Sequence, residues 1–205
     1  MNNDAWPELP LEHWRATCAT LHMWTQIVGK ICLELTPPVN HFWNIAFQVS
    51  ARGLTTPAMP CGGQRTLNMT FDFLHHELVA QCSDGGIRSI PLAPRSVAVF
   101  YRDTLGMLHE MGIDVKIWTM PVEIPDPIRF ELDTTHASYD PDSAQRFWRL
   151  RRNLLGTGVR NRGGEAGGGE GQRRQDRRHR LQPYDERRKL FLAEIRAPGP
   201  GHEQY

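Results

Sequence analysis

Three polar residues near the N-terminus are spaced so that a helix would place them on one side. His22, Gln26 and Lys30, here called the polar strip, follow one another at intervals of four residues, and residues four apart on an α-helix are neighbours. The strip could form the floor of a pocket, in which His22 transfers a proton or holds a ligand, Lys30 binds an anion and Gln26 orients the bound group. The alternative, which we favour, is that the strip is the solvated side of an otherwise buried helix.

Four residues are candidates for catalysis: His22, Lys30, His41 and His136. The last two flank predicted loops, from which they could join the polar strip. Metal ligands usually recur at short fixed spacings such as H-x-H or C-x-x-C, and the sequence contains neither. It also lacks a glycine-rich nucleotide loop and a nucleophile elbow. We therefore expect no metal and no cofactor.

The candidate binding residues are Gln26, Arg52, Arg95 and Trp43. Arg52 adjoins a glycine and Arg95 precedes a predicted helix start, positions that suit the clamping of an anion or a carboxylate. For both arginines, a structural salt bridge to a carboxylate of the same domain is the interpretation that we favour. Asp72 alternates with two phenylalanines in a predicted strand, so we expect its side chain to face solvent.

The elements that position these residues can be read from hydrophobic periodicity. A period of 3.6 predicts a helix from Leu11 to about Lys30, with Gly29 near its end. A period of two then predicts strands at 31–35 and 41–51. Further strands are expected at 66–73, 77–82, 87–92 and 114–118, with a hairpin through Ser83-Asp84-Gly85-Gly86.

Two more helices complete the predicted fold. Ser96 is expected to cap a helix that runs to about Met111, and Asp140-Pro141 opens another that reaches Leu150. Residues 119–139 contain three prolines and are expected to be extended and wrapped around the domain. Strands in one block with helices before and after them argue for an α+β fold. We predict a mostly antiparallel sheet with an N-terminal helix, one central helix and a helix after residue 140.

Composition divides the chain at about residue 150. Residues 1–150 hold all six tryptophans and carry a net charge of −5, whereas residues 151–205 carry +6. The first part is expected to be the globular domain. The second is rich in Arg and Gly, which cannot build a core, and we predict a disordered low-complexity tail. Arg-rich segments can also bind nucleic acid through phosphates, but the aromatic residues of a single-strand platform are missing here.

Several features indicate a soluble cytoplasmic protein. The N-terminus has no basic start and no apolar core of a secretory signal, and no apolar run is long enough to span a membrane. The four cysteines are widely spaced, and we interpret them as buried or inert thiols. We expect no membrane partner.

Several motifs resemble a bacterial family described only as a domain of unknown function. They are W-P-x-L-P at residue 6, H-M-W-T-Q-I-V-G-K at 22, P-P-x-N-H-x-W at 37, A-R-G-L-T-T at 51, P-R-S-V at 94 and H-A-S-Y-D-P at 136. The resemblance covers residues 4–150 and implies no activity, cofactor or substrate. Members of that family continue with a second aromatic-rich block, so we hypothesise that this chain is truncated or frameshifted after about residue 150. An interrupted domain would expose apolar surface near Phe147 and Trp148, where a homo-oligomer could form.

The leading hypothesis for function is a binding or interaction domain. One alternative is a small-molecule enzyme that uses the polar strip together with His41, His136 or Arg52. Another is association with nucleic acid through the basic tail. A concave pocket that joins the strip to those residues would favour the enzyme, whereas a convex, exposed strip would count against it.

Overall fold

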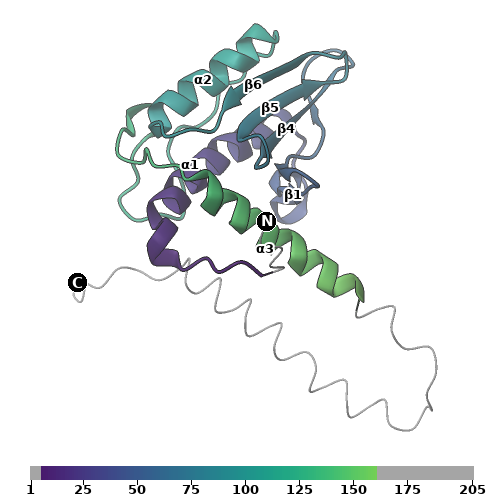
Figure 1. Cartoon of the computed structure of the whole chain (residues 1–205). Coiled ribbons are helices and arrows are strands. Elements are labelled where there is room, and N and C mark those ends of the chain that lie inside the picture. Colours follow the sequence, from purple (N-terminus) through teal and green to yellow (C-terminus); the bar gives the residue numbers. More distant parts are fainter. Residues whose placement is uncertain (1–5, 161–205) are drawn as a thin grey trace, which may run out of the picture. The chain divides into compact units, whose positions relative to one another are not determined.

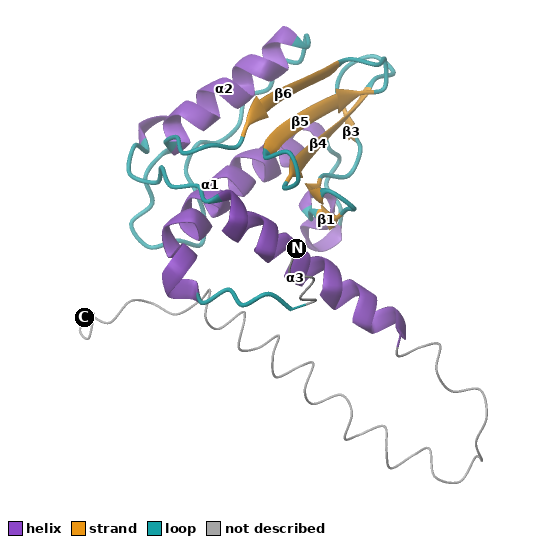
Figure 2. Cartoon of the chain, in the orientation of Figure 1, coloured by secondary structure: helices purple, strands orange, loops and turns teal. Residues whose placement is uncertain are grey.

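A long helix and an antiparallel sheet form the frame of the fold (Figures 1 and 2). The computed structural model describes residues 6–160. In chain order, the elements are α1 (Leu11–Leu35), η1 (Asn40–Ile45), β1 (Gln48–Val49), β2 (Gly53–Thr55), β3 (Met59–Pro60), β4 (Thr66–Asp72), β5 (Glu77–Cys82), β6 (Ile87–Pro91), α2 (Val97–Glu110), η2 (Phe130–Leu132) and α3 (Pro141–Arg160).

Within residues 6–160, the strands form one six-stranded antiparallel sheet. Its order is β1-β2-β4-β5-β6, and β3 also pairs with β4. β5 and β6 form the predicted hairpin, in which Gln81 is opposite Ile87. The turn is closed by a 2.8 Å bond from Cys82 N to Gly86 O. Gly85 has φ +91°, which explains why the turn needs a residue without a β-carbon.

Helices α1 and α2 cover the same face of this sheet. Along β4, Leu67, Met69 and Phe71 are fully buried while the residues between them are half-buried, so one face lies against the helices. The ring of Phe100 in α2 stacks on Trp24 of α1, with centroids 4.5 Å apart, and on Phe71 at 6.4 Å. The core therefore lies between one helical layer and one sheet, and the predicted α+β class is confirmed.

Helix α1 is longer than predicted. It passes through Gly29 without a break and ends at Leu35, so the strand predicted at 31–35 is wrong. Ile31 and Cys32 are fully buried and continue the helical face of Ile27 and Val28. A run of only five residues that alternate in polarity fits a strand, but it also fits the continuation of an amphipathic helix. The local pattern therefore could not distinguish the two.

The strand predicted at 41–51 is also mostly wrong. Residues 40–45 form the helical turns of η1, and only Gln48–Val49 are in a strand. His41 and Phe42 have φ of +57° and +55°, which no strand residue adopts. The amide of Asn44 donates to Thr36 Oγ1 at 2.8 Å, and Asn44 O accepts from Cys32 Sγ at 3.0 Å. These contacts hold the segment as a compact turn at the end of α1.

The predicted helix caps are confirmed. Ser96 Oγ accepts from Val99 N at 3.3 Å, and Asp140 Oδ2 accepts from Ser143 N at 3.1 Å. Gly112, with φ +71°, follows the end of α2. Residues 114–118 do not form the expected strand, whereas residues 119–139 wrap the domain as predicted, with only η2 as regular structure.

Helix α3 packs through the side chains that were expected to be exposed. Trp148 is 2% exposed and donates its indole N–H to Ser50 O at 3.1 Å. Phe147 is half-buried against Trp14 of α1, with ring centroids 5.4 Å apart. The prediction of a raw apolar face here is therefore wrong. The helix also continues to Arg160, past the predicted boundary at residue 150, while most of the predicted tail lies outside the described residues.

Two findings bear on the environment of the protein. Among residues 6–160, no helix combines the length and the apolar character needed to cross a membrane. The four cysteines are free thiols, and the prediction that they are buried is confirmed for Cys32, Cys61 and Cys82, while Cys18 is half-buried.

Candidate functional site

Gln26, the middle residue of the polar strip, is clamped to the backbone of Val122. Its Nε2 donates to Val122 O at 2.9 Å, and its Oε1 accepts from Val122 N, also at 2.9 Å. Because a backbone N–H can only donate, this reciprocal pair fixes which end of the amide is oxygen and which is nitrogen. Gln26 therefore ties the wrapped segment 119–139 to α1.

The clamp also determines the tautomer of His22. The second N–H of Gln26 Nε2 points to His22 Nε2, 3.2 Å away, so that ring nitrogen must be an unprotonated acceptor. His22 is then neutral, with its proton on Nδ1. Partial burial lowers the pKa of His22, nearby Glu123 opposes this change, and the positive charge of a protonated His136 adds to it.

His136 is oriented by a buried carboxylate. Asp133 is 1% exposed, and its Oδ2 lies 2.7 Å from His136 Nδ1. Its Oδ1 accepts from the backbone N–H groups of Thr135 and His136 at 3.0 and 3.1 Å. The backbone carbonyls of Asp133 and His136 in turn accept from Ala98 N and Val97 N at the start of α2. Asp133 and His136 thus form a dyad in which the carboxylate contacts Nδ1 of the imidazole, and the other ring nitrogen, Nε2, takes no part in this contact.

Lys30, the last residue of the polar strip, lies on the indole of Trp118. Its Nζ is 4.4 Å from the ring centroid, within the range of a cation–π contact. Partial burial lowers the pKa of Lys30. Gln26 and Lys30 hold residues 118–122 against α1, whereas His22 is exposed. The strip is therefore only in part the solvated side that we favoured, and its link to another candidate is the effect of the charge of His136 on the pKa of His22.

Arg52 and Arg95 form the salt bridges that we favoured. Arg52 lies 2.6 Å from Asp72 Oδ2, and Arg95 lies 3.1 Å from Asp103 Oδ2. Asp72 is 3% exposed, so the expectation that it faces solvent is wrong. The chain turns directly after β4, and Asp72 Oδ1 accepts the N–H groups of Leu74 and His75 in that turn. The carboxylate therefore closes the turn instead of continuing the alternation of the strand.

Three further histidines have other neighbours. His41 is exposed on η1, and His75 contacts Arg52. His76 Nδ1 lies 2.9 Å from the hydroxyl of Tyr139 on another side of the turn. Across residues 6–160, no three His, Cys, Asp or Glu side chains are arranged to hold a metal ion.

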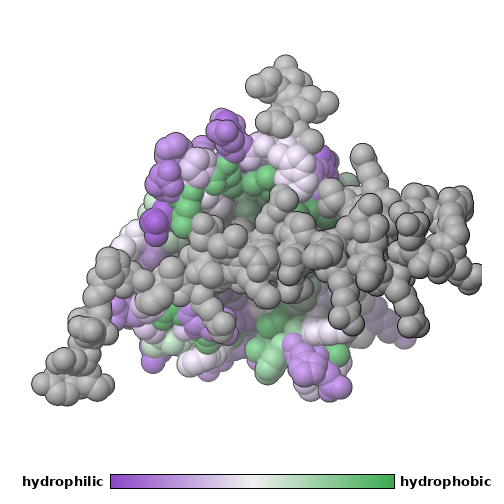
Figure 3. Space-filling view, turned by 90° about the horizontal axis from the view of Figure 1, so that it is seen from below, coloured by the Kyte–Doolittle hydropathy of each residue, from purple (hydrophilic) through white to green (hydrophobic). Residues whose placement is uncertain are grey.

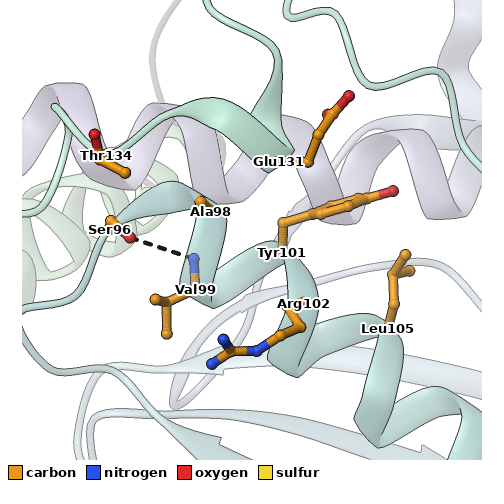
Figure 4. Close-up of a pocket in the computed structure, with 8 residues that line it drawn as sticks. All are labelled: Ser96, Ala98, Val99, Tyr101, Arg102, Leu105, Glu131 and Thr134. Carbon is orange, nitrogen blue, oxygen red and sulfur yellow. Dashed lines mark hydrogen bonds between the residues drawn. The ribbon is translucent and has the colours of Figure 1, made fainter.

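Two shallow hollows lie on either side of Glu131. The first, of about 520 Å³, has an apolar floor from the outer face of α2 and is bordered by Tyr101, Arg102, Glu131 and Thr134 (Figure 4). Burial raises the pKa of Tyr101, and the neighbouring charge of Glu131 adds to this. The second, of about 510 Å³, lies between residues 116–119 and 129–131. Neither hollow is lined by His22 or His136.

Two strongly exposed aromatic side chains lie next to each other in η1. Trp43 is 74% exposed and Phe42 63%, and Val39 beside them is 53% exposed. Residues 37–43 are all exposed, and we call them the aromatic loop. Seen from below, the described surface carries hydrophobic patches directly beside hydrophilic ones (Figure 3).

Sequence reasoning selected Trp43 but missed Phe42, Trp118 and Asp133. The spacing Asp133-x-x-His136 is a local signal that could have identified the dyad, because an Asp side chain often accepts backbone N–H groups two and three residues later. The packing of Trp118 on Lys30 joins residues 88 positions apart and has no local signal.

Comparison with family models identifies a family of unknown function, DUF5996, which matches residues 6–155. No curated protein matches the chain, and no solved structure matches it.

Proposed function

The chain belongs to the DUF5996 family of unknown function, and from this premise we propose that its domain binds another protein through the aromatic loop. The observation that carries the proposal is the exposure of Phe42 and Trp43, whose side chains are among those most enriched at protein interfaces. Leu33, near the C-terminus of α1 and four residues before the loop, is also exposed at 41%.

The backbone conformation of the aromatic loop supports a role in binding. Two consecutive non-glycine residues, His41 and Phe42, have positive φ, and the left-handed region costs an L-residue roughly 1–2 kcal/mol. The strain is held by Asn44, which is buried and bonded to the end of α1. Strained backbone of this kind concentrates at functional sites. The result here is that two aromatic rings stand in solvent.

Charge favours a protein partner over a lipid or nucleic-acid surface. The domain carries a net charge of −5 over residues 1–150, and the compensating +6 lies in residues 151–205, so the domain by itself does not attract phosphate backbones or anionic lipid headgroups. The aromatic loop has no acidic or basic side chain apart from His41. Its partner is therefore expected to present an uncharged, apolar segment. Association with nucleic acid through residues 161–205 concerns a part of the chain outside the described residues.

We place this activity in the cytoplasm. Four free thiols are what a reducing compartment maintains, whereas disulfides form and persist in exported proteins.

The enzyme hypothesis has less support. Of its candidates, His22 and His136 are linked only by the effect of the charge of His136 on the pKa of His22, while Lys30 is engaged by Trp118 and Arg52 by Asp72. The oriented dyad of Asp133 and His136 is compatible with proton transfer, but no nucleophile stands beside it in the contacts described above.

The proposal is tested by selecting peptides from a random display library on the immobilised 205-residue protein. Selected peptides are then titrated against the double variant Phe42→Ala/Trp43→Ala and against Ile87→Ala, a control with similar exposure on the β5–β6 hairpin. Loss of an aromatic anchor commonly costs about 2 kcal/mol or more, so we expect affinity for the double variant to fall at least about thirtyfold. Equal affinity for the double variant would contradict the proposal.

A further inference from the structure

A cationic hollow with an aromatic wall lies beside Lys30 of α1, and its lining shares no residue with the aromatic loop. Its lining is Lys116, Ile117, Trp118, Thr119, Arg129 and Glu131, and its volume is about 510 Å³. Small-molecule sites usually occupy about 300–1,000 Å³, so the hollow is large enough for a metabolite. Its cations stand out in a domain with a net charge of −5.

The first wall is built by residues 116–119. Exposure alternates along this segment, since Ile117 is 6% exposed and anchors it to the core, while Lys116 and Trp118 are exposed on either side of Ile117. Trp118 is 66% exposed although Lys30 covers one face of its ring. The opposite face of the indole is therefore open to a planar group.

The second wall is built by Arg129 and Glu131. It is joined to the first by a 3.0 Å bond from Phe130 N to Thr119 O and by a 3.1 Å bond from Thr119 Oγ1 to Glu131 Oε1. Arg129 Nη1 lies 3.8 Å from the same carboxylate oxygen and remains 57% exposed. A contact of this length leaves most of the five guanidinium N–H groups available to an anion.

We propose that this hollow binds a small planar anion, a ring that carries a carboxylate or a phosphate. The ring stacks on the open face of Trp118, and the anionic group lies between Lys116 and Arg129. Lys30 supports the site from behind by fixing the plane of the indole. Glu131, held by Thr119, positions Arg129 and disfavours ligands with a second negative charge near it.

The test is calorimetric titration of the full chain at low salt. The probes are 2-aminobenzoate and adenosine 5′-monophosphate, each compared with its neutral ring (aniline, adenosine) and with the anion alone (acetate, inorganic phosphate). We expect at least one complete probe to bind about tenfold tighter than either of its halves, with affinity that falls as salt is added. Binding of only the carboxylate or only the phosphate probe identifies the anionic group of the ligand.

Variants locate the site. Trp118→Leu and Arg129→Glu should each lower the affinity for the probe about tenfold or more. Ile87→Ala and Arg88→Glu, which alter an exposed apolar residue and an exposed arginine on β6, should leave the affinity for the probe within about twofold. Circular dichroism checks that each variant is folded. If Trp118→Leu does not fold, the loss of probe affinity in Lys116→Glu and Arg129→Glu locates the site. No binding of either probe below about 10 mM, or equal losses in the control variants, would overturn the proposal.

Discussion

The contact between Gln26 and His22 predicts how a single substitution changes a titration. In Gln26→Glu, one carboxylate oxygen can still accept from Val122 N. The other oxygen takes the place of the amide nitrogen, which in the native protein lies 3.2 Å from His22 Nε2 and 2.9 Å from Val122 O. The neutral tautomer assigned to His22 loses its donor, and the protonated ring gains an acceptor with a negative charge. The substitution should therefore raise the pKa of His22, which is below its ordinary value in the native protein.

The size of the effect follows from Coulomb's law. Two unit charges 4 Å apart attract by about 1 kcal/mol even in bulk water, which raises the ratio of protonated to neutral His22 about fivefold at a given pH. His22 is exposed, so the bulk-water value is the appropriate one. At the same time, repulsion from Val122 O and the lost bond should reduce the free energy of unfolding by about 1–2 kcal/mol near neutral pH.

The assay is an NMR titration of the histidine rings, with the His22 signal assigned through His22→Asn. The matched control is Gln26→Met, which removes the polar contact without adding charge. We expect the titration of His22 to move to higher pH in Gln26→Glu and not in Gln26→Met. An unchanged His22 titration in Gln26→Glu would refute the tautomer and the clamp from which it was derived.

Three further predictions concern stability and are checked by chemical denaturation. Gly53→Ala should prevent stable folding or reduce stability by more than about 3 kcal/mol, because a β-carbon there would lie 1.8 Å from Phe71 O. Trp148→Phe keeps the packed ring but removes the bond to Ser50 O, so a loss of about 1 kcal/mol is expected; no loss would show that the indole N–H is not buried against that carbonyl. Burial raises the pKa of Asp72, but the N–H groups of His75 and Leu74 and the Arg52 guanidinium outweigh it and hold the pKa below its ordinary value. Asp72 therefore stabilises the fold above about pH 4 and loses this contribution as the pH falls further, a dependence that Asp72→Asn should weaken.

The parts of the fold that were predicted correctly are those fixed by local chemistry. Turn glycines and one strongly alternating run define the β5–β6 hairpin, and the hydroxyl of Ser96 marks the start of α2. The errors at 31–35 and 41–51 have a shared cause, since short alternating runs acquire their conformation from the contacts around them. The hydrogen bond from Asn44 to Thr36 at the end of α1 could not be predicted from the spacing of residues in the sequence.

The candidate site was predicted only in part for a related reason. The i, i+4 spacing of the polar strip correctly places its residues on one helix face, but what covers that face comes from Trp118 and Val122, far along the chain. The favoured salt bridges of Arg52 and Arg95 were predicted from the excess of carboxylates over cations in the domain as a whole. Their partners were not, and Asp72 was expected to face solvent although the turn after β4 and Arg52 bury its carboxylate.

The most direct test of the binding role of the aromatic loop is the indole N–H spectrum of the six tryptophans, recorded while a peptide selected on the native protein is added. Trp43 is identified through Trp43→Phe and Trp118 through Trp118→Phe. The signal of Trp43 is predicted to shift and saturate with the peptide, while that of Trp118 stays in place. A peptide that binds and shifts Trp118 or another tryptophan, with Trp43 unmoved, would contradict the assignment of the aromatic loop as the protein-binding surface.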